Sequence, residues 1–129
     1  MKLTDQELTR LAATAVMGWP IVAATDLADY DGPFPAYCDG AALTGCLRGH
    51  EWEPLTDWRA AGELVEKMRA DGWELDLYCT VGAGSNARFI SSQWPKRKAR
   101  PVSMETSGPR AITVAALLAV AAVSEEQVC

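Results

Sequence analysis

Hydrophobic positions near the start of the chain follow a helical period and predict a helix over about residues 5–17. Thr4 and Glu7 have the spacing of a capping box, in which each side chain accepts a hydrogen bond from the backbone N–H of the other. Gly18 then ends the helix, because glycine adopts a left-handed conformation without steric cost. The apolar face recurs every three or four residues and consists of Leu8, Leu11, Ala12, Ala15 and Val16.

A second amphipathic helix is predicted between Thr56-Asp57, a favourable helix start, and Asp71-Gly72, a favourable end. Charged side chains occupy its other face, as expected for a helix that packs on a core with one side only. Its apolar stripe consists of Ala61, Leu64, Val65 and Met68.

Strict alternation of apolar and polar residues predicts a half-buried strand over residues 73–80. Residues 82–86, with the sequence Gly-Ala-Gly-Ser-Asn, predict a turn, and residues 87–94 predict the returning strand of a hairpin. A basic turn at residues 95–98 precedes a third predicted strand around residues 100–105.

The last predicted helix begins at Ser107-Gly108-Pro109, since proline fits the first helical turn, where its missing N–H needs no partner. Residues 111–123 contain almost no polar side chain, so this helix must be covered on most sides. The sheet, another helix or a second subunit can provide that cover, which makes a homo-oligomer plausible. The run is shorter than the roughly 20 apolar residues that cross a membrane.

These elements predict a single α+β domain over residues 1–129, because the chain is too short for two independent cores. We expect a small three-stranded antiparallel sheet layered with helices, in the order helix, long loop, helix, three strands, helix. The long loop, about residues 20–54, is rich in proline and glycine and shows no lasting period. We therefore interpret it as an irregular insertion.

The chain carries a negative net charge. Twelve Lys and Arg against seventeen Asp and Glu give a net charge of −5, which argues against non-specific binding of nucleic acid. The N-terminal residues are too charged for a secretory signal, so we expect a cytoplasmic protein. In that reducing compartment cysteines are expected to be thiols.

Three segments at element boundaries resemble a known family. Residues 15–19 (Ala-Val-Met-Gly-Trp), residues 54–58 (Pro-Leu-Thr-Asp-Trp) and residues 106–112 (Thr-Ser-Gly-Pro-Arg-Ala-Ile) occur in this order. Together they resemble the phage "ABA sandwich" domain family of small phage and prophage proteins, over about residues 1–19 and 54–123. The resemblance implies a phage or prophage origin and a layered α/β fold, and it implies no catalytic residues.

Cations with one tryptophan form the candidate ligand site. Arginine side chains can grip phosphate and a tryptophan can stack on a base, whereas the alternative is a solvated hairpin tip. Arg110 can assist from the first turn of the last helix, because a helix N-terminus favours negative charge. The set consists of Arg88, Trp94, Lys96, Arg97, Lys98, Arg100 and Arg110.

Aromatic residues of the long loop form the candidate partner-binding site, because aromatic side chains dominate the energetics of protein interfaces. The alternative is that they pack a small core of the loop itself. These residues are Tyr30, Phe34, Tyr37 and Trp52.

Four residues, Cys38, Cys46, His50 and Cys79, are of types that bind zinc. Cys46 and His50 form an acceptable half of a site, but no second pair at such spacing accompanies them, so we predict no metal and no cofactor. Nothing indicates an oxyanion hole or an orienting group for Cys46 and His50 as nucleophile and base. The glycine-rich residues 82–86 lack the lysine and the helix of a phosphate-binding loop.

By association with phage origin, we expect a non-catalytic accessory protein that acts by stoichiometric binding. Its expected partner is a host immune protein, for example a CRISPR effector, or a nucleotide immune signal that it sequesters as a sponge. A structural or regulatory phage protein and a small nucleotide-cleaving enzyme are the alternatives. No membrane partner is expected.

Overall fold

The computed structural model describes residues 2–22, 37–38, 52–80, 84–91, 98–99, 103–105 and 107–128. Helix α1 (Asp5–Leu11) continues into a short π-helix, η1 (Ala12–Val16), which together confirm the first predicted helix. The capping box is formed, since the backbone N–H of Glu7 donates to the Thr4 hydroxyl and that of Thr4 donates to the Glu7 carboxylate, at 3.2 and 3.1 Å. Gly18 follows with φ of +74°.

Helices α3 (Trp58–Ala70) and α4 (Gly108–Ala119) confirm the two later predicted helices, except that α4 ends at Ala119, before the end of the apolar run at residue 123. Asp57 caps α3 by accepting from the backbone N–H of Arg59 at 3.1 Å, and Gly72 follows its end with φ of +94°. Ser107 caps α4, and proline stands in the first turn of that helix. A short helix, α5 (Glu125–Val128), follows and is one the sequence pattern did not predict.

The main sheet is built on strands β3 (Trp73–Thr80) and β4 (Gly84–Ser91), which pair antiparallel along their full length. Two short strands, β5 (Lys98–Ala99) and β6 (Ser103–Glu105), pair separately with β4. A second, parallel pair is formed by β1 (Ile21–Val22) and β2 (Tyr37–Cys38).

The α+β class is confirmed, but the prediction of a three-stranded antiparallel sheet is wrong. In the part of the chain that is described, only β3 and β4 form a long antiparallel pair, and two short segments stand where one third strand was expected. Pro101 lies between those segments in the sequence and has no N–H for a continuous ladder. The returning strand also begins at Gly84, earlier than predicted, because pairing with β3 outweighs the turn-like composition of residues 84–86.

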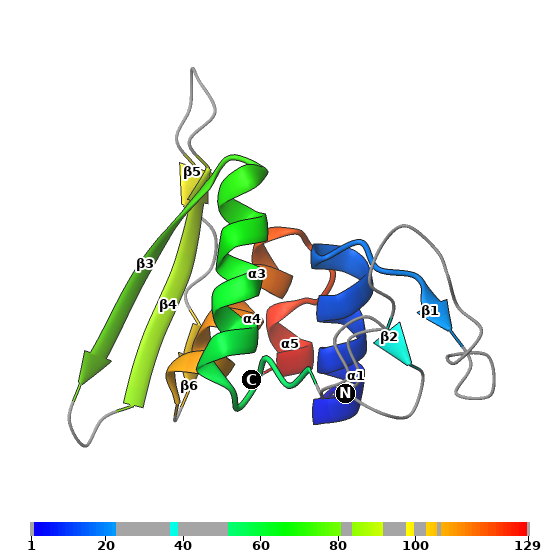
Figure 1. The fold of residues 1–129 in the computed structure, drawn as a ribbon. Coiled ribbons are helices and arrows are strands. Elements are labelled where there is room, and N and C mark those ends of the chain that lie inside the picture. Colours follow the sequence, from blue (N-terminus) through cyan, green and yellow to red (C-terminus); the bar gives the residue numbers. More distant parts are fainter. Residues whose placement is uncertain are drawn as a thin grey trace.

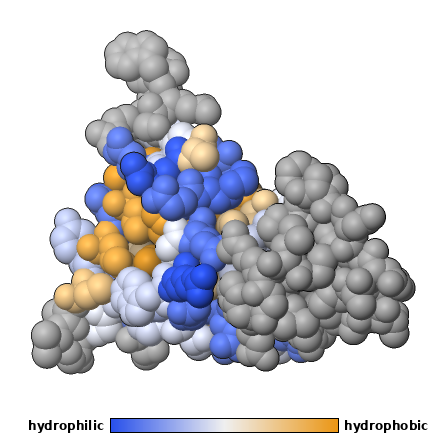
Figure 2. All heavy atoms as spheres, in the orientation of Figure 1, coloured by the Kyte–Doolittle hydropathy of each residue, from blue (hydrophilic) through white to orange (hydrophobic). Residues whose placement is uncertain are grey.

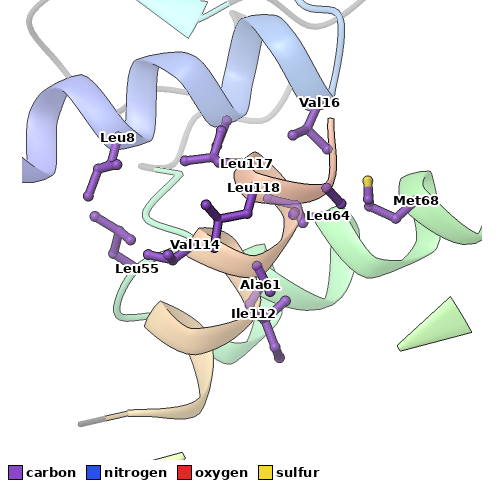
Figure 3. Packing of buried hydrophobic residues seen from close by; sticks show 14 of the residues in the cluster. Leu8, Val16, Leu55, Ala61, Leu64, Met68, Ile112, Val114, Leu117 and Leu118 are labelled. Carbon is purple, nitrogen blue, oxygen red and sulfur yellow. The ribbon is translucent and has the colours of Figure 1, made fainter. Parts of the chain in front are cut away.

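The helices pack in layers on one side of this sheet (Figure 1). Helix α4 lies on β4, α3 lies beside it over the hairpin, and η1 contacts both helices from the side away from the sheet. Side chains of α1, α3 and α4 point toward one another in this core, as Figure 3 shows for Leu8, Leu64 and Leu117.

Helix α4 is covered within this single chain. Every one of its residues except Arg110 is buried, and its neighbours are β4, α3, β6 and η1. The apolar sequence of α4 therefore does not require a second subunit. Among the described residues, no helix combines the length and the apolar character needed to cross a membrane.

One buried polar side chain ties α4 to the segment before α3. The hydroxyl of Thr113, which is fully buried, lies 2.8 Å from the carbonyl oxygen of Pro54 and 2.9 Å from that of Pro109. Pro109 is one helical turn earlier in α4, whereas Pro54 is remote in sequence. A single hydroxyl thus lies within hydrogen-bond distance of a carbonyl of its own helix and of a carbonyl in the segment that leads into α3.

Replacement of Thr113 by valine should lower the free energy of unfolding by about 1–3 kcal/mol, because the buried carbonyl of Pro54 loses its donor while the side-chain shape is kept. Thr113→Ser keeps the hydroxyl and should retain the hydrogen bond. Urea unfolding of the three proteins measures both effects. A serine variant that is less stable than the valine variant would show that the methyl group, not the hydroxyl, matters at this position.

Candidate interaction surface

The hairpin of β3 and β4 has two faces of different character. Ser85, Ala87 and Phe89 of β4 are buried toward the helices, and the residues that pair with them, Cys79, Leu77 and Leu75, share that face. No described helix packs on the opposite face. We call this opposite face the open face; it carries Glu74, Asp76, Tyr78, Asn86, Arg88 and Ile90.

An ion pair crosses the open face between the strands. Arg88 Nε lies 3.1 Å from Asp76 Oδ2, and both side chains are partly exposed. Next to this pair on β3 stands Tyr78, whose exposed fraction of 67% is the largest among the described large hydrophobic residues. A rigid aromatic ring beside polar groups is the composition that protein interfaces use at their centres.

The sequence pattern predicted partner contacts at the aromatic residues of the long loop and not at Tyr78. Its signal was present, because it stands on the polar side of the alternating pattern over residues 73–80. An aromatic residue at a position reserved for solvent is the kind of exception that indicates a contact surface.

The outer part of the hairpin is apolar on its helix side as well. Leu75 and Leu77 are only half-buried and Cys79 is exposed, because α3 does not reach across to the edge of β3. Figure 2 shows this apolar surface beside α3, over the hairpin.

Arg110, predicted to bind an anion, is already engaged with two carboxylates. Its Nη1 lies 2.8 Å from Asp5 Oδ1 in α1, and its Nε lies 3.1 Å from Glu105 Oε2 in β6. Burial alone would lower the pKa of Arg110, but the hydrogen bonds and charges of Asp5 and Glu105 outweigh it and raise the pKa above its ordinary value. The guanidinium therefore remains charged and joins the first helix to the start of α4.

The two described arginines of the predicted anion site, Arg88 and Arg110, lie on different sides of the sheet. Glu105, which holds Arg110, pairs in register with Ser85 on the helix side, whereas Arg88 is on the open face. The structure therefore does not bring these two cations together. Of the other members, Lys98 lies in β5, and Trp94, Lys96, Arg97 and Arg100 lie outside the described residues.

The loop aromatic residues are only partly described. Trp52 is fully buried and packs edge-to-face on Trp19, with ring centroids 4.7 Å apart, so its ring belongs to the core and not to a contact surface. Its indole Nε1 has no hydrogen-bond acceptor among the described residues. Tyr37 lies in β2, whereas Tyr30 and Phe34 fall outside the described residues.

The cysteines considered as zinc ligands are likewise spread over the chain. Cys79 is an exposed thiol whose sulfur accepts a hydrogen bond from the Ser85 hydroxyl at 3.5 Å. Cys38 lies in β2, and Cys46 and His50 are outside the described part of the chain. Within that part, no group of three potential ligands occurs.

Two of the segments that carry the family resemblance contact each other in the structure. The ring of Trp58, at the start of α3, lies so close to Gly108, at the start of α4, that a Cβ atom at position 108 would overlap it. Pro54 and Thr113 form the hydrogen bond described above. These motif residues therefore have a structural role, which is to dock the beginnings of two helices.

No family model, curated protein or solved structure matches this chain. The resemblance to the phage "ABA sandwich" family accordingly stays a prediction. The structure itself shows the geometry of the open face and of the two ion pairs of Arg110.

Replacement of Arg110 by methionine should lower the free energy of unfolding by about 1–3 kcal/mol, since Glu105, with 17% of its side chain exposed, loses its ionic partner. Adding Glu105→Gln to that variant should restore part of the loss, because no buried carboxylate is left unpaired. Asp5→Asn is the matched control; its side chain is 71% exposed, so it should change stability by less than about 1 kcal/mol. Thermal and urea unfolding measure all three variants, and a double variant no more stable than Arg110→Met alone would contradict this explanation.

Proposed function

We propose that this protein acts by stoichiometric, non-catalytic binding of a protein partner through the open face of the β3–β4 hairpin. The observation that carries the proposal is Tyr78, a largely exposed ring on a rigid strand, beside the ion pair of Asp76 and Arg88. The strand fixes the backbone of Tyr78, and a tyrosine side chain has few rotatable bonds, so little conformational entropy is lost when a partner docks.

A protein partner is favoured over a nucleotide by the state of the described cations. Arg88 is paired with Asp76, and Arg110 is paired with Asp5 and Glu105. A phosphate group would have to displace these carboxylates before either arginine could grip it. Sequestration of a nucleotide signal therefore rests on the basic sequence of residues 94–100 alone.

The biological setting of the proposal comes from the sequence resemblance. A phage or prophage origin makes a counter-defence role the leading hypothesis, with a host immune protein, for example a CRISPR effector, as the antagonised partner. A structural or regulatory role in phage development is the alternative, and it makes a different prediction in infection assays.

We expect the protein, produced in bacteria that carry a matching defence system, to restore plaque formation by a restricted phage. Tyr78→Ala should reduce that protection at least about tenfold, because an aromatic residue at the centre of an interface contributes about 2 kcal/mol or more. Gln6→Ala, at an exposed position of α1, is the matched control and should protect as the wild type does. Efficiency of plating measures the effect, and circular dichroism verifies that each variant is folded.

Equal protection by the Tyr78→Ala variant would contradict the assignment of the open face. A deletion phage with reduced yield in undefended hosts would favour the structural or regulatory role. Incubation with cyclic dinucleotides and ADP-ribose signals tests two other functions, sequestration of a nucleotide signal and cleavage of a nucleotide. A protein that sequesters the ligand returns it intact after heat denaturation, whereas an enzyme returns a product.

A further inference from the structure

We propose that strand β3 is a dimerisation edge, which pairs antiparallel with β3 of a second copy and joins the two hairpins into one continuous sheet. This inference concerns the edge of the hairpin, whereas the proposed function concerns its open face. The two surfaces share Asp76 and Tyr78 of β3, so a dimer enlarges the open face and places both copies of Tyr78 beside its axis.

Apart from the charged side chains of Glu74 and Asp76, the edge of β3 lacks the features that keep natural edge strands apart. Among the described strands, β3 pairs with β4 alone, and its register runs unbroken over eight residues from Trp73 to Thr80, without a bulge. The strand contains no proline, lysine or arginine, the residues that most often protect an edge. Its outer N–H and C=O groups therefore form a long row that can pair with another strand.

The acidic side chains of β3 favour one particular register for pairing with a second copy. With the twofold axis at Leu77, Asp76 of one copy stands opposite Tyr78 of the other, so no two acidic residues oppose each other. An axis at Asp76 would place that aspartate opposite itself. An axis at Leu75 would place Glu74 opposite Asp76, which is again unfavourable.

The same register joins the apolar strips on the helix side of the two copies. Directly opposed residues of antiparallel strands point to the same face, so Leu77 meets Leu77 of the second copy and Leu75 meets its Cys79. In one chain the two leucines are half-buried and Cys79 is exposed. Contact with the opposed side chains would remove the edge-facing sides of Leu75, Leu77 and Cys79 from water.

The helices leave room for this pairing. Helix α4 packs on β4, and β3 is the outermost described element of the molecule on that side (Figure 1). Since opposed residues share a face, the helices of both copies would lie on one side of the combined sheet, and both copies of Tyr78 would lie on the other, flanking the axis.

The test is the mass of the protein in solution, measured by sedimentation equilibrium up to about 0.1 mM. We expect the wild type to reach twice the mass of one chain. Tyr78→Glu places a second acid opposite Asp76 at two symmetric positions and should raise the dissociation constant about tenfold. Tyr78→Lys is the matched control and should bind as tightly as the wild type or more tightly, because it faces Asp76 with the opposite charge. Tyr78 is exposed, so both variants should fold.

Crosslinking tests the register directly. In a Cys79→Ser background, Leu77→Cys should form a disulfide between copies under mild oxidation, and mass spectrometry should identify a link between the two residues at position 77. A monomeric wild type over the whole concentration range, a dimer that tolerates Tyr78→Glu and Tyr78→Lys equally, or a dimer without the 77–77 link would each overturn the proposal. Because these measurements need no target, their failure would leave the proposed partner binding to be judged on the infection assays.

Discussion

The constraint on which the rest of this structure depends is the burial of α4. A helix without a polar face has to be surrounded, and here β4, α3 and η1 surround it within one chain. The only residue of α4 that is not buried is Arg110, and it is held by two carboxylates. The sheet, α3 and η1 therefore all bury their inner faces against α4.

The burial of these inner faces against α4 determines which surfaces remain available for contacts with a partner. With the inner face of β4 against α4, the opposite face of the hairpin and the edge of β3 are the surfaces of the described main sheet that keep partly exposed side chains. Both proposals use these surfaces, one through the ring of Tyr78 and the other through the backbone of β3. They differ in chemistry, because the face offers side chains and the edge offers hydrogen-bonding groups.

The sequence predicted the helices and the first strand of the hairpin well, because their signals are local. Thr4 with Glu7, Asp57 and Ser107 are caps that act within one helical turn, and each has that role in the structure. The third strand was predicted wrongly because pairing with β4, not local pattern, decides which of residues 98–105 are strand.

The candidate sites were harder to predict, since they depend on which side of the sheet a residue occupies. Arg88 and Arg110 are both basic, but no feature of the sequence indicated that Asp76, Asp5 and Glu105 would pair with them. Trp52 gave the same signal as an exposed aromatic residue, although it packs on Trp19 in the core. Tyr78 could have been found, because the alternation of β3 already placed it toward solvent.

The two ends of the described chain meet on the helical side of the molecule. The backbone N–H of Leu3 donates to the carbonyl of Gln127 at 2.9 Å, and α1 and α5 lie close together there (Figure 1). A tether attached at either end therefore leaves from the same place, away from the sheet. Immobilising the protein by its first or last residues would present the hairpin outward to a partner in solution. A short linker between the ends would also allow circular permutation, with new termini elsewhere in the chain, without separating these two helices.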